Sequence, residues 1–206
     1  MSLAQYKSKR KFNDTREPDT AVKKGNKQLS FVVQRHKASH LHYDFRLEME
    51  GVLKSWAVPK GPSLNPADKR LAMMVEDHPY DYKDFKGVIP EGNYGAGIVE
   101  IWDSGTYTAL TDDKNADHEK LLRAGLKAGN LKFVLKGKKL NGEFALVKIK
   151  NRSSDKDNTW LLLKHNDKFA TDKDYNSENE TLKKSSINKA LAEKTNAPIK
   201  KKSAMV

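Results

Sequence analysis

Three of the six histidines lie in one short stretch, between Phe31 and Leu47, together with an aspartate. From residue 41 onward apolar and polar residues alternate, which is typical of a half-buried strand and puts His42 and Asp44 on one polar face. Imidazoles and a carboxylate can coordinate a divalent metal from one side and leave the other positions for water or substrate. The stretch therefore predicts an open metal site.

A β-hairpin would bring a further histidine to this face. Residues 31–35 are β-prone, and the short segment after His36 can turn the chain back. In an antiparallel hairpin centred on Ser39, His36 lies opposite His42, and opposed residues have Cβ atoms about 4.5–5.5 Å apart. The predicted metal ligands are thus His36, His42 and Asp44. The alternative is a surface hairpin whose polar residues hold no metal.

Other charged residues could act on a phosphate beside such a metal. His78 follows an apolar run, where a loop would expose it as a further ligand, a phosphate contact or a general acid. Arg46 continues the polar face, and Lys60 and Arg70 flank a proline-rich loop. Cations so placed can hold phosphate oxygens and offset charge in a transition state. The alternative is that all of them are ordinary surface residues.

Composition limits the class of protein. The chain has 206 residues, which fits one domain with tails, and a formal net charge of +12. It has no cysteine, so disulfides, Cys-ligated zinc, iron–sulfur clusters and thiol catalysis are excluded. The positive charge indicates a polyanionic partner such as nucleic acid, because lysines and arginines on phosphates release counterions. We find no signal peptide or membrane span and expect a soluble, intracellular protein.

The remaining pattern is mainly β. Short β-prone runs, separated by Gly, Pro, Asn and Asp, cover residues 53–58, 71–75, 98–102, 131–135, 144–150 and 160–164. That spacing predicts a barrel or a sandwich. Asp117, leucines at helical spacing and Gly129 predict one helix over residues 117–128, which we expect to plug one end of the barrel.

Three segments follow from this reading. Residues 1–27 form a basic arm, expected to lie as a loop over the domain and to contribute to the site. Residues 28–170 form the β-barrel domain. In residues 171–206 lysines recur while apolar residues thin out, which predicts a disordered or weakly helical tail that adds phosphate contacts. The glycine-rich residues 90–97 lack the Gly-Lys-Ser/Thr of a phosphate-binding loop and are expected to be a tight connection between strands.

A series of motifs resembles one known family in the same order. They are Gln34-Arg35-His36, His42 to Leu47, Trp56 to Pro62, Glu76 to Pro79, Tyr82, Phe85-Lys86-Gly87, Ile89 to Gly95, Trp102 to Tyr107 and Gly142 to Val147. This series resembles the 3′-phosphoesterase domain of bacterial DNA ligase D, in a free-standing version. The resemblance covers the chain from about Tyr6 to Ala170.

The resemblance implies a compact β-barrel with flanking short helices and an Mn²⁺-dependent enzyme, other divalent metals being possible. Family members heal DNA 3′ ends in non-homologous end joining: they remove a terminal ribonucleoside by phosphodiester cleavage and then the 3′-phosphate. The implied substrates are primer–template or duplex DNA with a 3′-ribonucleotide or a 3′-phosphate. The implied partners are a separately encoded ligase, polymerase and Ku, with no membrane. The implied location is the cytoplasm, at the nucleoid.

The family's functional residues carry over by position. His36, His42 and Asp44 match its metal ligands. Further active-site residues match His78, Arg46, Lys60, Arg70, Glu76 and Tyr82, and substrate- or phosphate-binding residues match Arg10, Glu17 and Gln34. Where the family usually reads Arg-Asp-Phe, this chain has Arg10-Lys11-Phe12. The change concerns the hydrogen bonds of the N-terminal arm.

Two other functions fit parts of the sequence. A non-haem Fe(II) oxygenase uses two histidines and a carboxylate, which His42, Asp44 and His78 could supply on an all-β fold. The charge of +12 and the cations suited to phosphate argue against it. A non-catalytic, basic DNA-end-binding module that recruits a ligase is the second alternative. The sequence assigns neither the nucleophile nor the general base.

Overall fold

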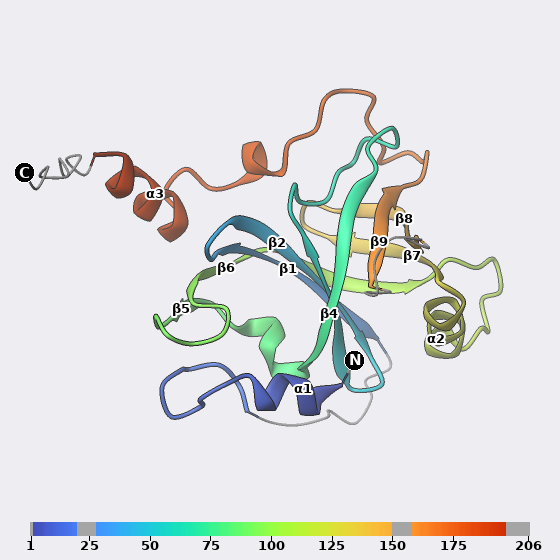
Figure 1. Cartoon of the computed structure of the whole chain (residues 1–206). Helices are drawn as coiled ribbons and strands as arrows, with labels where there is room; N and C mark the ends of the chain where they lie inside the picture. Colours follow the sequence, from blue (N-terminus) through green and yellow to red (C-terminus); the bar gives the residue numbers. More distant parts are fainter. Residues whose placement is uncertain (1, 20–27, 150–157, 197–206) are drawn as a thin grey trace, which may run out of the picture.

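One antiparallel sheet that closes on itself organises the chain (Figure 1). The computed structural model describes residues 2–19, 28–149 and 158–196. Its strands are β1 (Leu29–Lys37), β2 (Leu41–Met49), β3 (Val52–Val58), β4 (Arg70–Pro79), β5 (Gly87–Ile89), β6 (Gly97–Ala109), β7 (Asn130–Gly137), β8 (Asn141–Lys148) and β9 (Thr159–Lys164). They are ordered β1-β2-β3-β4-β9-β8-β7-β6, and β6 also pairs with β1, which closes the barrel. The predicted β-barrel is confirmed.

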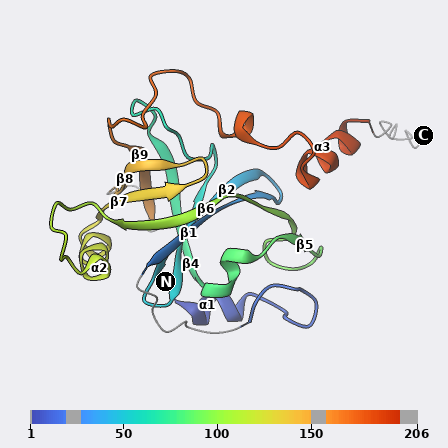
Figure 2. The same ribbon diagram turned by 180° about the vertical axis from the view of Figure 1, so that it is seen from behind.

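Short helices flank the barrel, as predicted. They are α1 (Leu3–Ser8), the 3₁₀ helix η1 (Tyr80–Asp84), α2 (His118–Ala128), the 3₁₀ helix η2 (Ser177–Glu180) and α3 (Ser186–Asn196). The two views show α1 below the barrel next to β4, with α2 on one side of the barrel and β5 on the other, and α3 near the end of the chain (Figures 1 and 2). No helix among the described residues is long and apolar enough to cross a membrane.

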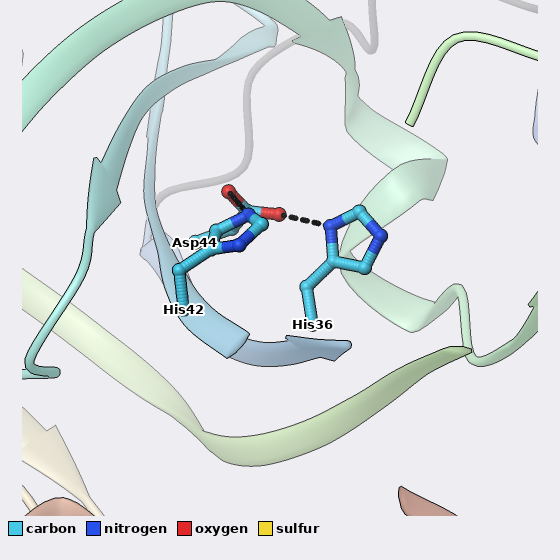
Figure 3. Close-up of side chains that lie close together, drawn as sticks. All are labelled: His36, His42 and Asp44. Carbon is cyan, nitrogen blue, oxygen red and sulfur yellow. Dashed lines mark ion pairs between the residues drawn. The ribbon is translucent and has the colours of Figure 1, made fainter. Parts of the chain in front are cut away.

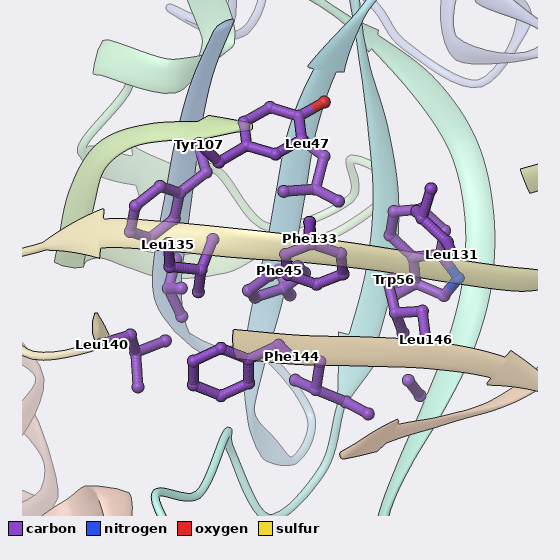
Figure 4. Packing of buried hydrophobic residues seen from close by; sticks show 14 of the residues in the cluster. Phe45, Leu47, Trp56, Tyr107, Leu131, Phe133, Leu135, Leu140, Phe144 and Leu146 are labelled. Carbon is purple, nitrogen blue, oxygen red and sulfur yellow. The ribbon is translucent and has the colours of Figure 1, made fainter. Parts of the chain in front are cut away.

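Inward-facing side chains of every barrel strand fill the interior (Figure 4). The rings of Phe133 and Phe144 stack with centroids 6.3 Å apart, and Phe45 lies 5.9 Å from Phe133. Trp56 is fully buried in the same cluster. Each such side chain contributes about 1.5–3 kcal/mol on burial. Because Phe45 and Leu47 point inward, the alternate residues of β2 must point outward.

The one helix predicted from the sequence is found at its predicted place. The Asp117 side chain accepts a hydrogen bond from the backbone N–H of Lys120 at 3.0 Å, which caps the start of α2. Gly129 ends it in the left-handed conformation, at φ 73°. Leu122 belongs to the barrel core and Leu126 packs against it. The helix lies against β7, β6 and β2.

A second apolar cluster lies on the outer face of the barrel and anchors the N-terminal arm. It consists of Tyr6, Leu53, Tyr82, Phe85, Ile89 and Val99, with Phe12 packed against it. Tyr6 is fully buried, and its hydroxyl donates to the carbonyl of Pro18 at 2.8 Å. The arm is therefore not the simple loop that the sequence predicted. Its helix α1 places one aromatic ring under η1 and β5.

The C-terminal segment, predicted to be a disordered or weakly helical tail, packs on the barrel over its described residues 171–196 and contains η2 and α3. Ser177 and Ile187 are fully buried. The indole N–H of Trp102 donates to the carbonyl of Ser177 at 3.1 Å, and the Ser177 hydroxyl donates to the carbonyl of Pro62 at 2.6 Å. These are single contacts without apolar periodicity, so no pattern in the sequence predicts them. Residues 197–206 of the predicted tail lie outside the described residues.

A buried arginine holds this segment. The Arg35 side chain is 1% exposed, and it donates through Nε and Nη2 to the two carboxylate oxygens of Glu178 at 3.0 and 2.6 Å. The hydroxyl of Tyr43 donates to the same carboxylate, and Glu100 lies 3.6 Å from Arg35. Such a two-pronged contact fixes orientation as well as charge. Arg35 thereby joins β1 to η2 across the end of the barrel.

We predict that Glu178→Gln lowers the free energy of unfolding, because it leaves Arg35 with less compensating charge. Breaking a fully buried pair costs about 3–5 kcal/mol. The Glu178 side chain is 36% exposed, so we expect a smaller loss, of about 1–2 kcal/mol. Denaturant unfolding measures it, with Glu180→Gln on the exposed side of η2 as control. Equal stability of both variants would show that the segment is not held by this pair.

Candidate metal site

The β1–β2 hairpin sets the candidate site. His36 pairs with His42 and Gln34 pairs with Asp44 in the antiparallel register, so the predicted hairpin register is confirmed. His42 and Asp44 are two residues apart on β2 and therefore share its outer face. Figure 3 shows the three side chains, from the two strands, converging on one point.

The three groups form a cluster that could hold a metal ion. His36 Nδ1 lies 3.5 Å from one carboxylate oxygen of Asp44, and His42 Nε2 lies 3.6 Å from the other (Figure 3). One possible ligand atom from each residue lies within 4.8 Å of the other two. His36 and Asp44 are buried, whereas the His42 side chain is 23% exposed. An ion held there would be open to solvent and substrate on one side.

Backbone carbonyls fix both imidazoles in the form that a metal ligand requires. His36 Nε2 lies 2.9 Å from the carbonyl oxygen of Gly95, and His42 Nδ1 lies 3.0 Å from that of His40. A carbonyl only accepts, so each of these nitrogens carries the hydrogen. The nitrogens that face Asp44 then keep their lone pairs. This is the usual arrangement of metal-binding histidines, and the donor set fits a divalent transition metal.

Arg46 sets the charge of the carboxylate. Its Nη2 donates to Asp44 at 2.9 Å, its Nε to Gln34 at 2.7 Å and its Nη1 to Ser55 at 3.0 Å. Burial opposes ionisation of Asp44, but the guanidinium of Arg46 outweighs it and holds the pKa of Asp44 well below its ordinary value. Asp44 is therefore a carboxylate at neutral pH. Three of the five N–H donors of Arg46 serve to hold this cluster.

The cluster opens into a cavity of about 200 Å³. Among the predicted site residues, those that line it are Arg10, His36, His42, Asp44, Arg46, Glu76, His78 and Tyr82. The structure thus brings together residues from the N-terminal arm, β1, β2, β4 and η1. The guanidinium groups of Arg10 and Arg46 lie beside the cluster of His36, His42 and Asp44, so the cavity suits an anion next to a metal.

His78 is placed differently from its prediction. It lies within β4, not in an exposed loop, and is 3% exposed. Its Nδ1 lies 2.9 Å from the carbonyl oxygen of Glu76, so Nε2 is the acceptor, 3.3 Å from Nη2 of Arg10. Burial and the charges of Arg46 and Arg10 hold the pKa of His78 well below its ordinary value. The imidazole is neutral, and in this form it accepts a hydrogen bond from Arg10.

The N-terminal arm supplies one wall of the cavity. The Arg10 side chain is 4% exposed and donates to Glu17 at 2.9 Å and to Glu76 at 3.3 Å. Lys9 donates to the other carboxylate oxygen of Glu76 at 3.0 Å. Lys11, where this chain departs from the family pattern, is exposed to solvent. The departure therefore leaves the bonds of Arg10 in place.

Gln34 and Glu17, predicted as substrate- or phosphate-binding residues, lie behind the cavity and are not among the residues that line it. Gln34 is fully buried and donates to the carbonyls of Tyr82 and Phe85, both at 2.9 Å, while its oxygen accepts from Arg46. Glu17 is 4% exposed and accepts from Arg10 and from the Tyr82 hydroxyl, the latter at 3.0 Å. Both residues hold groups that do line the cavity.

Lys60 and Arg70 lie apart from the metal cluster. They line a neighbouring pocket of about 320 Å³, whose lining also includes Leu41 at the start of β2 and Tyr175 of the C-terminal segment. Arg70 donates to the carbonyl of Tyr175 at 2.6 Å and to Asp68 at 2.8 Å. Lys60 is exposed. The structure thus does not bring these two predicted active-site residues into the cavity of the metal cluster.

The glycine-rich loop of residues 90–97, predicted only as a tight connection between strands, also forms part of the cavity. It lines the cavity with Tyr94 and Gly95. Gly92 and Gly95 have φ of +86° and +79°, a conformation that favours glycine and curves the loop towards the site. An aromatic residue between two glycines in a connection is the signal that could have identified it.

Comparison with known proteins identifies relatives over most of the chain. A family model for the DNA ligase D 3′-phosphoesterase domain matches residues 34–148. The chain is 50% identical over 167 residues, 80% of its length, to a multifunctional non-homologous end joining protein LigD of Pseudomonas aeruginosa. It is 41% identical over 152 residues, 73% of its length, to that of Mycolicibacterium smegmatis. These matches cover 19% and 20% of the relatives, so the chain spans about a fifth of their length.

We predict that Asp44→Ala and His36→Ala each weaken binding of Mn²⁺ by more than the roughly 10- to 100-fold that loss of a group supporting a ligand costs. Titration calorimetry measures the affinity, and circular dichroism checks that the barrel is folded. His40→Ala is the matched control, because this exposed histidine lies in the same hairpin and its backbone carbonyl stays in place. Unchanged affinity in His36→Ala would remove His36 from the ligand set.

Proposed function

Because the chain belongs to the DNA ligase D 3′-phosphoesterase domain family, we propose that it is a metal-dependent phosphoesterase that processes DNA 3′ ends in non-homologous end joining. The observation that carries the proposal is the His36, His42 and Asp44 cluster with both imidazoles oriented by carbonyls. Its reactions would be removal of a 3′-terminal ribonucleoside and of a 3′-phosphate. The implied partners are DNA ends and a separately encoded ligase, polymerase and Ku, at the nucleoid in the cytoplasm.

Mn²⁺ is the metal we propose for the cluster. Two imidazole nitrogens and a carboxylate oxygen form a donor set of intermediate softness, which accepts Mn²⁺ and also Fe²⁺ or Zn²⁺. When bound, such an ion acts as a Lewis acid on a phosphate oxygen and orients the phosphate. Arg46 keeps the carboxylate ionised and in place for this task.

We assign the cations in and beside the cavity to different phosphates of the nucleic acid. Arg10 lines the cavity itself, so we assign it to the phosphate at which the bond is cleaved. Lys60 and Arg70 lie in the neighbouring pocket, where they suit a phosphate further along the strand. The strand would then run from the metal cluster across the end of β2 towards the C-terminal segment.

In the proposed reaction His78 is a positioning residue for Arg10. Its neutral Nε2 accepts from Arg10 and so aims the guanidinium into the cavity. The low pKa of His78 means that it carries no proton to give to a leaving oxygen at neutral pH. Of the roles that the sequence left open, the geometry therefore supports orientation of a phosphate-binding group over general acid catalysis.

The oxygenase alternative is not favoured by the geometry. It required His42, Asp44 and His78 as ligands, whereas the imidazole that joins the cluster is that of His36. His78 instead faces Arg10 with its accepting nitrogen, and a cation there opposes a metal ion. A non-catalytic end-binding module would have the same cations, so turnover is the property that separates it from the proposed enzyme.

We predict turnover of duplexes that end in a 3′-ribonucleotide or a 3′-phosphate when Mn²⁺ is present. EDTA should abolish it, and His42→Ala should lower it at least about 100-fold because a metal ligand is lost. Gel analysis of labelled primers, with Mn²⁺ and Mg²⁺ in parallel, measures both reactions. Binding of DNA without cleavage under any metal would instead support the end-binding module.

The positioning role of His78 predicts different effects of two substitutions. His78→Ala removes the acceptor for Arg10 and should slow turnover about 10- to 100-fold while affinity for Mn²⁺ stays unchanged. His78→Gln offers an amide oxygen that can accept from Arg10, so it should recover much of the rate. Loss of a general acid would cost about 10²–10⁴-fold and would be equal in both variants. Equal losses would thus contradict the positioning role.

A further inference from the structure

The ring of Tyr94 stands at the rim of the cavity that contains the metal-ligand cluster. It is 50% exposed and lines the cavity together with Gly95, the residue whose carbonyl holds His36. We propose that this ring stacks on the nucleobase of the 3′-terminal nucleoside and makes Tyr94 a specificity-determining residue. The inference rests on the proposed function and assigns a part of the substrate to a part of the site.

The ring is held in place without being covered. The ammonium of Lys9 lies 4.7 Å from its centroid and the guanidinium carbon of Arg10 lies 5.6 Å from it. Cations at this distance are attracted to an aromatic face. The next residue, Gly95, is tied to β1 through its bond to His36. Tyr94 is thus a preorganised aromatic surface with half of its area free for a ligand.

The size of the cavity decides which part of the substrate reaches the ring. Its volume of about 200 Å³ is below the roughly 300 Å³ at which pockets for drug-sized ligands begin. A phosphate with its ribose takes up less of such a space than a complete nucleotide does. With the phosphate at the metal-ligand cluster, we therefore place the base at the rim of the cavity. Tyr94 is the exposed aromatic ring among the residues that line the cavity.

The direction of the strand assigns the base to the terminal nucleoside. The cations suited to the continuing strand, Lys60 and Arg70, lie beyond the end of β2 in the other pocket. On the Tyr94 side the cavity is walled by Arg10 and Glu76, which are bound to each other. We therefore assign this side to the terminal nucleoside and the side of Lys60 and Arg70 to the continuing strand. Stacking is tolerant of sequence because every base has an aromatic face, so all four bases would be accepted.

The test compares three duplexes that differ only at the primer 3′ end: a ribonucleoside with its base, a ribose without a base, and a phosphate. Tyr94→Leu keeps an apolar side chain but loses the ring, and should lower affinity and turnover about 10- to 100-fold for the first end alone. Tyr94→Phe keeps the ring and should match the unmodified protein. Affinity is measured by fluorescence anisotropy of labelled duplexes, and turnover on the same duplexes. Phe169→Leu, at a ring 44% exposed and outside the cavity lining, is the control.

The outcomes separate this inference from the proposed function. Equal losses of Tyr94→Leu on all three ends would overturn stacking and assign the ring to general packing. If the unmodified protein cleaves none of the ends with any divalent metal, the proposed function fails, and affinity alone decides the inference. Tighter binding of the end with a base, lost in Tyr94→Leu and kept in Tyr94→Phe, supports stacking. Equal binding of the ends with and without a base overturns it.

Discussion

The register between β1 and β2 is the constraint on which the site depends. Side chains on neighbouring positions of a strand point to opposite faces. A slip of one residue would therefore turn His42 and Asp44 into the barrel core and turn Phe45 to its outer face. The barrel prevents this slip, because Phe45 is packed against Phe133 in the core. The burial that stabilises the fold thus also fixes which two imidazoles meet the carboxylate. Geometry at the candidate metal site is a consequence of packing on the other side of the same strands.

Three buried arginines support the site, and two of them join it to segments outside the barrel. Arg46 holds Asp44 within the hairpin, Arg10 joins the N-terminal arm to β4 through Glu76, and Arg35 joins β1 to the C-terminal segment through Glu178. A buried ion pair adds little net stability, but an unpaired partner is costly, so each pair favours one arrangement strongly. The arm and the C-terminal segment are therefore held by buried ion pairs in addition to the apolar contacts of Tyr6 and Ile187.

The sequence predicted the parts that have a period. Short β-prone runs between turn residues identified most barrel strands. Alternation from residue 41, with a turn at Ser39, identified the hairpin register and with it the His36, His42 and Asp44 cluster. Glu76 and Tyr82 came only from the resemblance to a family, because nothing in their local pattern marks them. The docked ends were missed because they depend on single buried residues, such as Tyr6 and Ser177, without periodicity. The burial of His78 was missed because its polar neighbours Glu76 and Asp77 are typical of a loop, whereas β4 continues through His78 to Pro79.

The same features explain why one small cavity can serve both proposed reactions. A 3′-phosphate and a phosphodiester place the same kind of group at the metal cluster, and they differ in what lies beyond it. Arg10, held by Glu17 and Glu76, cannot follow the substrate, so the phosphate must come to a fixed point. The part that varies, a nucleoside or nothing, then falls at the open rim beside Tyr94. An enclosed phosphate site with an open rim thus accommodates different ends without any change in the residues that hold the metal.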